Sequence, residues 1–161
     1  KLSPKRSRYG SKKDNKYIHI KTGQNSRLDS IQAAVLLINL RYLDEWNDTR
    51  VDIAKLYNRL IANNKTLKSS EQSHIYHHYV ILNKKRQKLQ NYLMQNQIKT
   101  EIHYPRVAAN EVQKFTKGIE IQYEQATFLS NHLLSLPMSP WHTYEQIKYV
   151  TDSLNEILNE N

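Results

Sequence analysis

An almost wholly apolar stretch, residues 28–40, sets the strongest condition on any fold of this chain. Three- and four-residue spacing predicts a helix here, through Leu28, Ile31, Val35 and Ile38. Its other faces are also apolar, with Ala33, Ala34, Leu36, Leu37 and Leu40. A helix that is apolar nearly all round must be covered on more than one side. We therefore expect a central or an interface helix, which Ser26 and Asp29 would begin.

Farther along the chain, helical and strand patterns alternate. Amphipathic helices are predicted over residues 43–60, around 89–93 and over 121–134, the last with Ala126, Leu129 and Leu133 inward. Residues 74–82 are rich in β-branched and aromatic side chains and predict a strand, with Ile75, His77, Tyr79 and Ile81 on one face. Residues 98–104 alternate similarly before Pro105. Residues 106–118 are loop-like, and prolines mark a loop over 134–140.

The final helix has the clearest start. Thr143 and Gln146 form a capping box. The apolar stripe behind them is Ile147, Val150, Leu154, Ile157 and Leu158. The order of the elements favours an α+β fold in which helices cover a small sheet. Because two strands make a marginal sheet, we expect a third short strand or a partner surface to complete it.

Size and composition limit the class of protein. A chain of 161 residues has room for one domain with a core, and is too short for a two-domain enzyme of ordinary size. The absence of cysteine excludes a disulfide framework and thiolate chemistry. No apolar run approaches the roughly 18 residues that span a bilayer, and the basic N-terminus lacks the apolar stretch of a signal peptide. We expect a soluble, cytoplasmic protein with no membrane partner.

The net charge of +9 is concentrated at one end. Eight Lys and Arg side chains lie in residues 1–21 with Asp14 as the only acid, whereas residues 22–161 hold sixteen basic and fourteen acidic side chains. The leading segment is therefore either a solvated tail or an arm that binds phosphate or another anion. Because no nucleic-acid-binding module pattern is present, a nucleic-acid partner is the least favoured reading.

Histidines and polar motifs leave the chemistry open. His77 and His78 would point to opposite faces of a strand, and no cysteine accompanies them, so we predict no metal site. Gly23 to Asp29 is either an anion-binding helix start or a cap in which Arg27 pairs with an aspartate. His103-Tyr104-Pro105 is either a ligand-contacting corner or a strand end. No catalytic apparatus is visible from the residues alone.

Six ordered segments nevertheless resemble one family. These are residues 8–11 (RYGS), 23–34 (GQNSRLDSIQAA), 43–50 (LDEWNDTR), 74–81 (HIYHHYVI) and 102–105 (IHYP), followed by 134–138 (LSLPM). Together they resemble the DegT/DnrJ/StrS family of pyridoxal-phosphate-dependent nucleotide-sugar aminotransferases, and the likeness spans nearly the whole chain. It implies the small C-terminal domain of an aspartate-aminotransferase-like (fold type I) enzyme with long connecting helices: residues 1–24 a basic lead-in, 25–64 connecting or interface helices, and 65–161 the small domain.

The resemblance also implies roles for individual residues. Asn25 and Arg27 match positions that reach the cofactor in a neighbouring subunit's site of a homodimer. His103 and Tyr104 match a corner near the sugar nucleotide. His77 matches a position of the small domain that is either structural or substrate-lining. The lysine that forms the Schiff base with pyridoxal phosphate belongs to a motif that is not in this sequence, so the chain alone is expected to be inactive.

The parent reaction would transfer an amino group, typically from glutamate, to a keto-sugar nucleotide for surface-polysaccharide or related glycan synthesis. Two other readings stay open. One is a non-catalytic truncated or accessory homologue that binds a partner subunit, and the other is a basic nucleic-acid-binding module.

Overall fold

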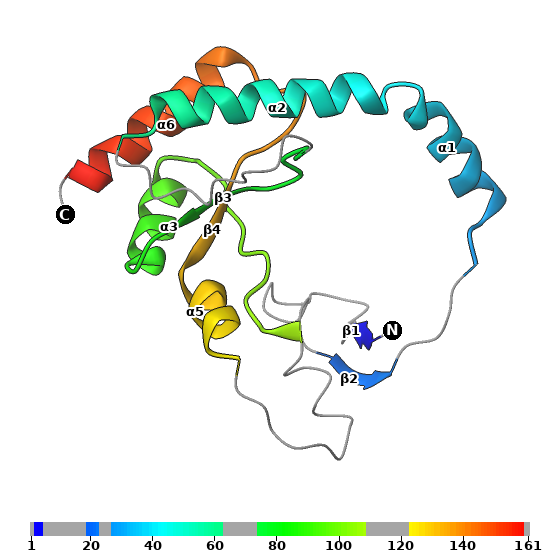
Figure 1. Ribbon diagram of the computed structural model, residues 1–161, viewed down its shortest axis with the longest axis horizontal. Helices are drawn as coiled ribbons and strands as arrows, with labels where there is room; N and C mark the ends of the chain where they lie inside the picture. Colours follow the sequence, from blue (N-terminus) through cyan, green and yellow to red (C-terminus); the bar gives the residue numbers. More distant parts are fainter. Residues whose placement is uncertain (1, 5–18, 23–26, 63–73, 109–122, 160–161) are drawn as a thin grey trace.

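A computed structural model describes residues 2–4, 19–22, 27–62, 74–108 and 123–159 of the chain (Figure 1). The elements that carry the fold are, in order, β1 (Leu2–Pro4), β2 (His19–Thr22), α1 (Ser30–Leu40), α2 (Leu43–Leu60), β3 (Tyr79–Leu82), α3 (Arg86–Gln95), α5 (Glu124–His132), β4 (Leu133–Leu136) and α6 (Tyr144–Asn159). β1 and β2 form one antiparallel pair, and β3 and β4 form another.

The β3–β4 pair lies at the centre of the packed part of the molecule. Tyr79 pairs with Leu136 and Leu82 with Leu133. Glu101 forms an isolated bridge to Ser135, so β4 lies between β3 and the segment that contains Glu101. This confirms the predicted α+β class. The additional strand that pairs with β3 is β4, whereas the strand predicted over residues 98–104 is reduced to the single bridged residue Glu101.

Helices α2, α3 and α6 supply the rest of the hydrophobic core, and α2 runs beside α6 (Figure 1). The core side chains that are essentially inaccessible to solvent are Ala54, Tyr57, Leu93, Leu134 and Leu154. The helix predicted over residues 43–60 is confirmed as α2, and residues 89–93 lie within α3 as predicted.

The predicted capping box at the start of α6 is confirmed in full. The Thr143 backbone N–H donates to Gln146 Oε1 at 3.0 Å, and the Gln146 N–H donates to Thr143 Oγ1 at 3.3 Å. Of the predicted stripe, Ile147, Val150, Leu154 and Ile157 are buried and Leu158 is half-buried. Two hydrogen bonds of the Asn155 side chain join α6 to the end of α2. Asn155 accepts from the Ala62 N–H and donates to the Leu60 carbonyl.

Helix α1 is not a central helix of this chain. None of its residues is buried, and Ile31 and Leu37 are 77% and 66% exposed. It lies apart from the helices that cover β3 and β4 (Figure 1). Its start also differs from the prediction, because Asp29 is itself the N-cap and accepts from the Ile31 N–H, while Ser26 lies outside the described residues.

Both predicted strands are shorter in the structure. Residues 74–78 are not extended, because Tyr76 has a φ of 49° and its N–H donates to the His74 ring, so the strand begins only at Tyr79. Tyr79 and Ile81 share the buried face as predicted, whereas Ile75 is 48% exposed. Of residues 98–104, only Glu101 pairs with a strand.

The region around residue 133 was also predicted incorrectly. The helix ends at His132, and Leu133 to Leu136 form β4, where helix and then loop were expected. All four residues of β4 are buried, so this run is apolar without alternation and its periodicity cannot distinguish a strand from a helix. Ala126, predicted to point inward, is exposed. The segment 106–118 falls largely outside the described residues.

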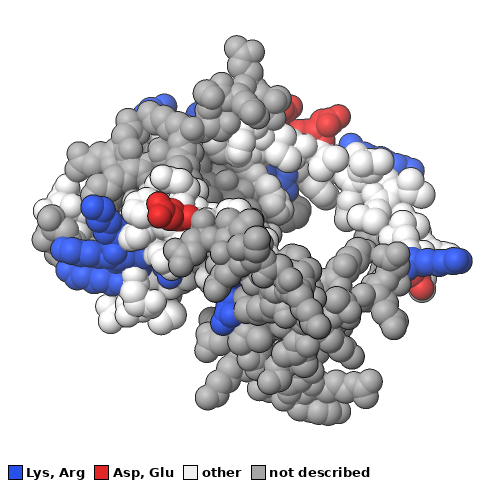
Figure 2. Space-filling model, turned by 60° about the horizontal axis from the view of Figure 1, so that its bottom comes forward, with Lys and Arg blue, Asp and Glu red and all other residues white. Residues whose placement is uncertain are grey.

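One face of the molecule shows how charged side chains are distributed over the described residues (Figure 2). Figure 2 shows Lys and Arg in separate groups among acidic and uncharged residues, so the visible described atoms form no continuous basic face. Within the part of the chain that the structure describes, no helix combines the length and apolar character that crossing a membrane requires.

Candidate functional site: a histidine-lined pocket

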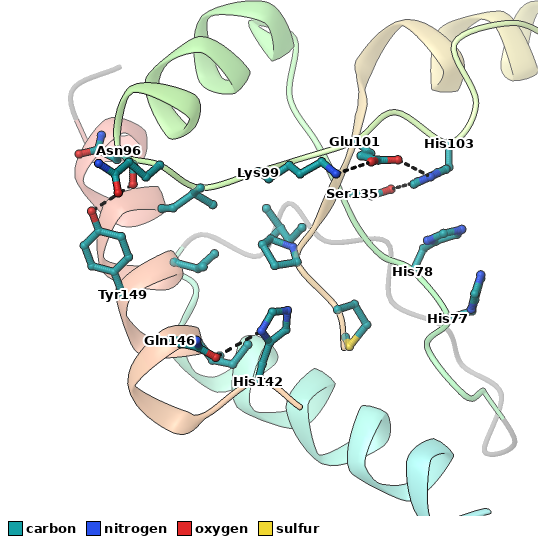
Figure 3. Close-up of a pocket in the computed structure, with 17 residues that line it drawn as sticks. His77, His78, Asn96, Lys99, Glu101, His103, Ser135, His142, Gln146 and Tyr149 are labelled. Atoms are coloured by element: carbon teal, nitrogen blue, oxygen red, sulfur yellow. Dashed lines mark hydrogen bonds and ion pairs between the residues drawn. The ribbon is translucent and has the colours of Figure 1, made fainter. Parts of the chain in front are cut away.

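A pocket of about 650 Å³ opens between the loops before β3, the segment that follows α3, the end of β4 and the first turns of α6 (Figure 3). Its polar lining comes from all four regions and includes His77, His78, Asn96, Lys99, Glu101, His103, Ser135, His142 and Gln146. Apolar side chains such as Ile98, Leu136 and Met138 form part of its wall. The volume is that of a small-molecule site.

His103 is held by both of its ring nitrogens. Nδ1 lies 3.1 Å from Ser135 Oγ, and Nε2 lies 3.3 Å from Glu101 Oε2 (Figure 3). The other Glu101 oxygen, Oε1, is 3.3 Å from Lys99 Nζ. Because the backbone groups of Glu101 and Ser135 also bond each other at 2.8 and 3.2 Å, both partners of the imidazole are anchored in the β4 bridge. The ring orientation of His103 is therefore set by the sheet.

His78 stacks on the face of His103. The ring centroids are 3.9 Å apart and the planes differ by 12°, while His77 lies 4.3 Å from His78 at a tilt of 57°. Burial lowers the pKa of His78, and the neighbouring His103 and His77 lower it further. Two positive charges about 4 Å apart repel by roughly 1 to 4 kcal/mol between bulk water and a protein surface. The stack therefore favours the neutral form of His78.

The opposite end of the pocket is formed by the start of α6. His142 Nδ1 lies 3.4 Å from Gln146 Oε1, and the same oxygen completes the capping box of that helix. Tyr149 donates to the Asn96 carbonyl at 3.2 Å, which links α6 to the end of α3. This end of the lining therefore offers amide and imidazole groups that can donate or accept hydrogen bonds.

The structure brings together only some of the residues singled out from the sequence. His77 and His103 line the same pocket, and His77 is exposed. Tyr104 is 58% exposed, lies edge-on to His103 with centroids 5.6 Å apart, and is not among the lining residues. Arg27 is exposed just before α1, also outside the pocket lining, and Asn25 lies outside the described residues.

The prediction that His77 and His78 point to opposite sides was wrong. Both line one pocket, because the backbone at residues 77 and 78 bends before β3 begins. Sequence reasoning also missed Glu101 and Ser135, which hold His103. The alternation of residues 98–104 placed Glu101 and His103 on one face, and this was the available signal for their contact.

The chemistry of the lining favours a polar organic ligand. Among the described residues, no three His, Cys, Asp or Glu side chains are arranged to hold a metal ion. The carboxylate of Glu101 already faces Lys99 and His103. The remaining groups are imidazoles, amides and hydroxyls, which suit ligands that both donate and accept hydrogen bonds.

Comparisons with known proteins show what this chain is similar to. The chain is similar to the dTDP-3-amino-3,6-dideoxy-α-D-galactopyranose transaminase of Aneurinibacillus thermoaerophilus, with 33% identity over 91% of this chain and 40% of that protein. It is similar also to the dTDP-3-amino-3,4,6-trideoxy-α-D-glucose transaminase of Streptomyces venezuelae, with 31% identity over 92% of this chain and 40% of that protein. The chain thus spans about 40% of the length of these relatives.

Solved structures agree in fold. The structure of Streptomyces venezuelae DesV in complex with a ketimine intermediate matches with a TM-score of 0.71 and 30% identity, over 93% of this chain and 41% of that one. NtdA of Bacillus subtilis with bound cofactor PMP shares the fold, with a TM-score of 0.69 over 87% of this chain and 34% of that one. The described α+β core therefore matches part of a sugar aminotransferase.

The family model of the DegT/DnrJ/EryC1/StrS aminotransferases matches residues 5–155. That range covers nearly all of the sequence and includes the pocket, the exposed α1 helix and each of the resembling motifs. The chain therefore belongs to the DegT/DnrJ/EryC1/StrS aminotransferase family.

Proposed function

We propose that this chain forms the small-domain part of a pyridoxal-phosphate-dependent aminotransferase that acts on a keto-sugar nucleotide. The observation that carries the proposal is the pocket in which His77 and His103, distant in sequence, line one cavity of about 650 Å³. Its polar lining of imidazole and amide groups suits a hydroxyl-bearing ligand. Glutamate as amino donor, a role in surface-polysaccharide or related glycan synthesis, and a cytoplasmic location belong to the same proposal.

The lysine side chains that the structure describes do not fit the aldehyde end of pyridoxal phosphate. That group needs a desolvated lysine, whereas Lys55, Lys99 and Lys148 have side chains that are 71%, 78% and 52% exposed. Lys84, Lys85 and Lys88 are exposed as well. We therefore propose that cofactor chemistry depends on a part of the enzyme outside this sequence and that the chain is inactive alone. Asn25 and Arg27 remain proposed contacts to the cofactor.

Helix α1 supports assembly as a homodimer with shared active sites. Its apolar residues are exposed over both sides of the helix, including Leu36 at 55% and Leu37 at 66%. An exposed apolar surface of this kind marks a protein interface. Arg27 lies directly before this helix, so burial of α1 against a second subunit would carry Arg27 toward that subunit. Residues 25–64 are accordingly proposed as connecting and interface helices, between a basic lead-in (1–24) and the small domain (65–161).

The same helix gives the non-catalytic alternative its support, since an accessory homologue would also need a partner surface. A nucleic-acid-binding role has less support, because residues 22–161 carry nearly balanced charge. Activity in an assembled enzyme separates the aminotransferase from both alternatives.

A chimera tests the proposal. The 161 residues replace the matching 40% of the Aneurinibacillus thermoaerophilus transaminase, and the same junctions flanking that enzyme's own segment provide the control. The expected result is glutamate-dependent amination of the 3-keto counterpart of that enzyme's named product. A folded chimera that retains pyridoxal phosphate but aminates no dTDP- or UDP-linked keto-sugar would refute the proposed activity.

The isolated chain tests its proposed inactivity. We expect no stoichiometric attachment to a single lysine after incubation with pyridoxal phosphate and borohydride, as measured by mass spectrometry of peptides. Full modification of one lysine would show that this chain holds its own cofactor site.

A further inference from the structure

The two stacked imidazoles of the pocket use their ring edges differently. Both nitrogens of His103 face groups of the chain itself, Ser135 Oγ and Glu101 Oε2. Its hydrogen-bonding edge is therefore engaged, and one face of the ring is covered by His78. In this arrangement His103 provides the ring face against which His78 stacks.

His78 is in the opposite situation. It is half-buried and lines the pocket, and within the described part of the chain its ring nitrogens make no hydrogen bond (Figure 3). His103 covers one face and His77 lies beside it, so the ring is confined by its neighbours. Glu101 acts on His78 electrostatically, and Lys99, His142 and Tyr149 are the other titratable groups of the pocket lining. An imidazole with a fixed plane and a free edge is suited to recognise a ligand.

We propose that His78 recognises the sugar ring of a nucleotide sugar, exchanging hydrogen bonds with its hydroxyl groups, and that His103, held by Glu101 and Ser135, positions it by stacking. This inference rests on the proposed function and names the part of the substrate that meets this end of the pocket. A neutral imidazole carries one donor and one acceptor, which is the pairing that a hydroxyl group offers in return. His103 is thus a positioning residue, although the motif resemblance alone placed it against the substrate.

Binding to the 161-residue chain tests the role of His78. The probes are dTDP-glucose and dTDP, titrated calorimetrically against the chain. We expect dTDP-glucose to bind more tightly than dTDP, and His78→Ala to weaken dTDP-glucose binding roughly two- to tenfold with dTDP binding unchanged. His78→Gln, which keeps a donor and an acceptor, restores part of the difference. His132→Ala is the matched control, because that ring contacts the Phe128 carbonyl in α5, outside the pocket lining.

Nitrogen-15 NMR of the histidine rings tests the positioning role of His103. Ser135→Ala removes one of the two groups that hold His103, and we expect it to shift the His78 ring signals and to reduce the preference for dTDP-glucose. A wild-type chain that binds neither probe, or both equally, overturns the proposal, as does a folded His78→Ala chain that discriminates them like the wild type. These binding and NMR readouts need no turnover. If the chain recognises the sugar through His78 but its chimera transfers no amino group, only the proposed aminotransferase activity is refuted.

Discussion

Removing one hydroxyl from the core should loosen the connection between α2 and the pocket. Tyr57 is fully buried, and its hydroxyl donates to the Pro137 carbonyl at 2.8 Å. Pro137 directly follows β4 and lines the pocket, two residues beyond Ser135. Tyr57→Phe keeps the ring and its contact with Tyr79, whose centroid is 4.7 Å away, and deletes only this hydrogen bond.

The magnitude follows from burial. A buried hydrogen bond contributes about 0.5–1.5 kcal/mol net, and a carbonyl left without its donor costs about 1–3 kcal/mol. The ring still fills its site, so no large cavity adds to the loss. We expect the free energy of unfolding to fall by about 1–3 kcal/mol, or Tm by roughly 2–12 °C for a chain of this size.

Urea unfolding followed by far-UV circular dichroism measures the effect. Tyr149→Phe is the control, because it removes a hydroxyl that donates to the Asn96 carbonyl at 3.2 Å from a side chain that is 53% exposed. That change should stay within about 0.5 kcal/mol. A Tyr57→Phe midpoint equal to that of the wild type or of the control would refute the reasoning.

The same residue has a signature at alkaline pH. Burial, and to a smaller extent Tyr79, raises the pKa of Tyr57 above its ordinary value of 10.0. The folded state keeps this proton to higher pH than the unfolded state does. The stability linked to the proton is therefore complete below about pH 10 and is lost as pH rises through the folded pKa. The Phe variant should lack this part of the alkaline loss.

Two further changes test the helix start and the histidine stack. Thr143→Ala removes the side-chain half of the α6 capping box and should cost about 1 kcal/mol in urea unfolding, while an unchanged midpoint would mean that Gln146 alone suffices. Because the pKa of His78 is lowered below 6.5, the unfolded state takes up this proton first, so stability should fall as pH drops below about 6.5. His78→Leu should flatten that acid dependence in urea midpoints, and an identical pH profile would contradict it.

The local sequence pattern was sufficient to predict the helices that are marked by short-range interactions. The span of α2 and the start of α6 were predicted from spacing and from one capping box, because those interactions join residues three or four apart. The α+β class followed from the order of elements. The motifs that identify the family are likewise short and continuous in sequence.

Tertiary pairing determined the rest. The residues of β4 were predicted as the end of a helix and the start of a loop marked by prolines, and no alternation in this buried run indicated a strand. The strand exists through its pairing with β3, more than fifty residues earlier. Because Tyr76 has a left-handed backbone conformation, the strand begins only at Tyr79. The side chains of both His77 and His78 line one pocket.

The sequence by itself determined the helices, the fold class and the family, because each rests on contacts or patterns within a few residues. Only the tertiary structure decided which imidazole is held and which is available. His103 meets Ser135 across 32 positions of sequence, and His78 meets His103 across 25, so no local periodicity encodes either contact. Both depend on how Glu101 and β3 approach β4 from its two sides, which is a property of the folded sheet.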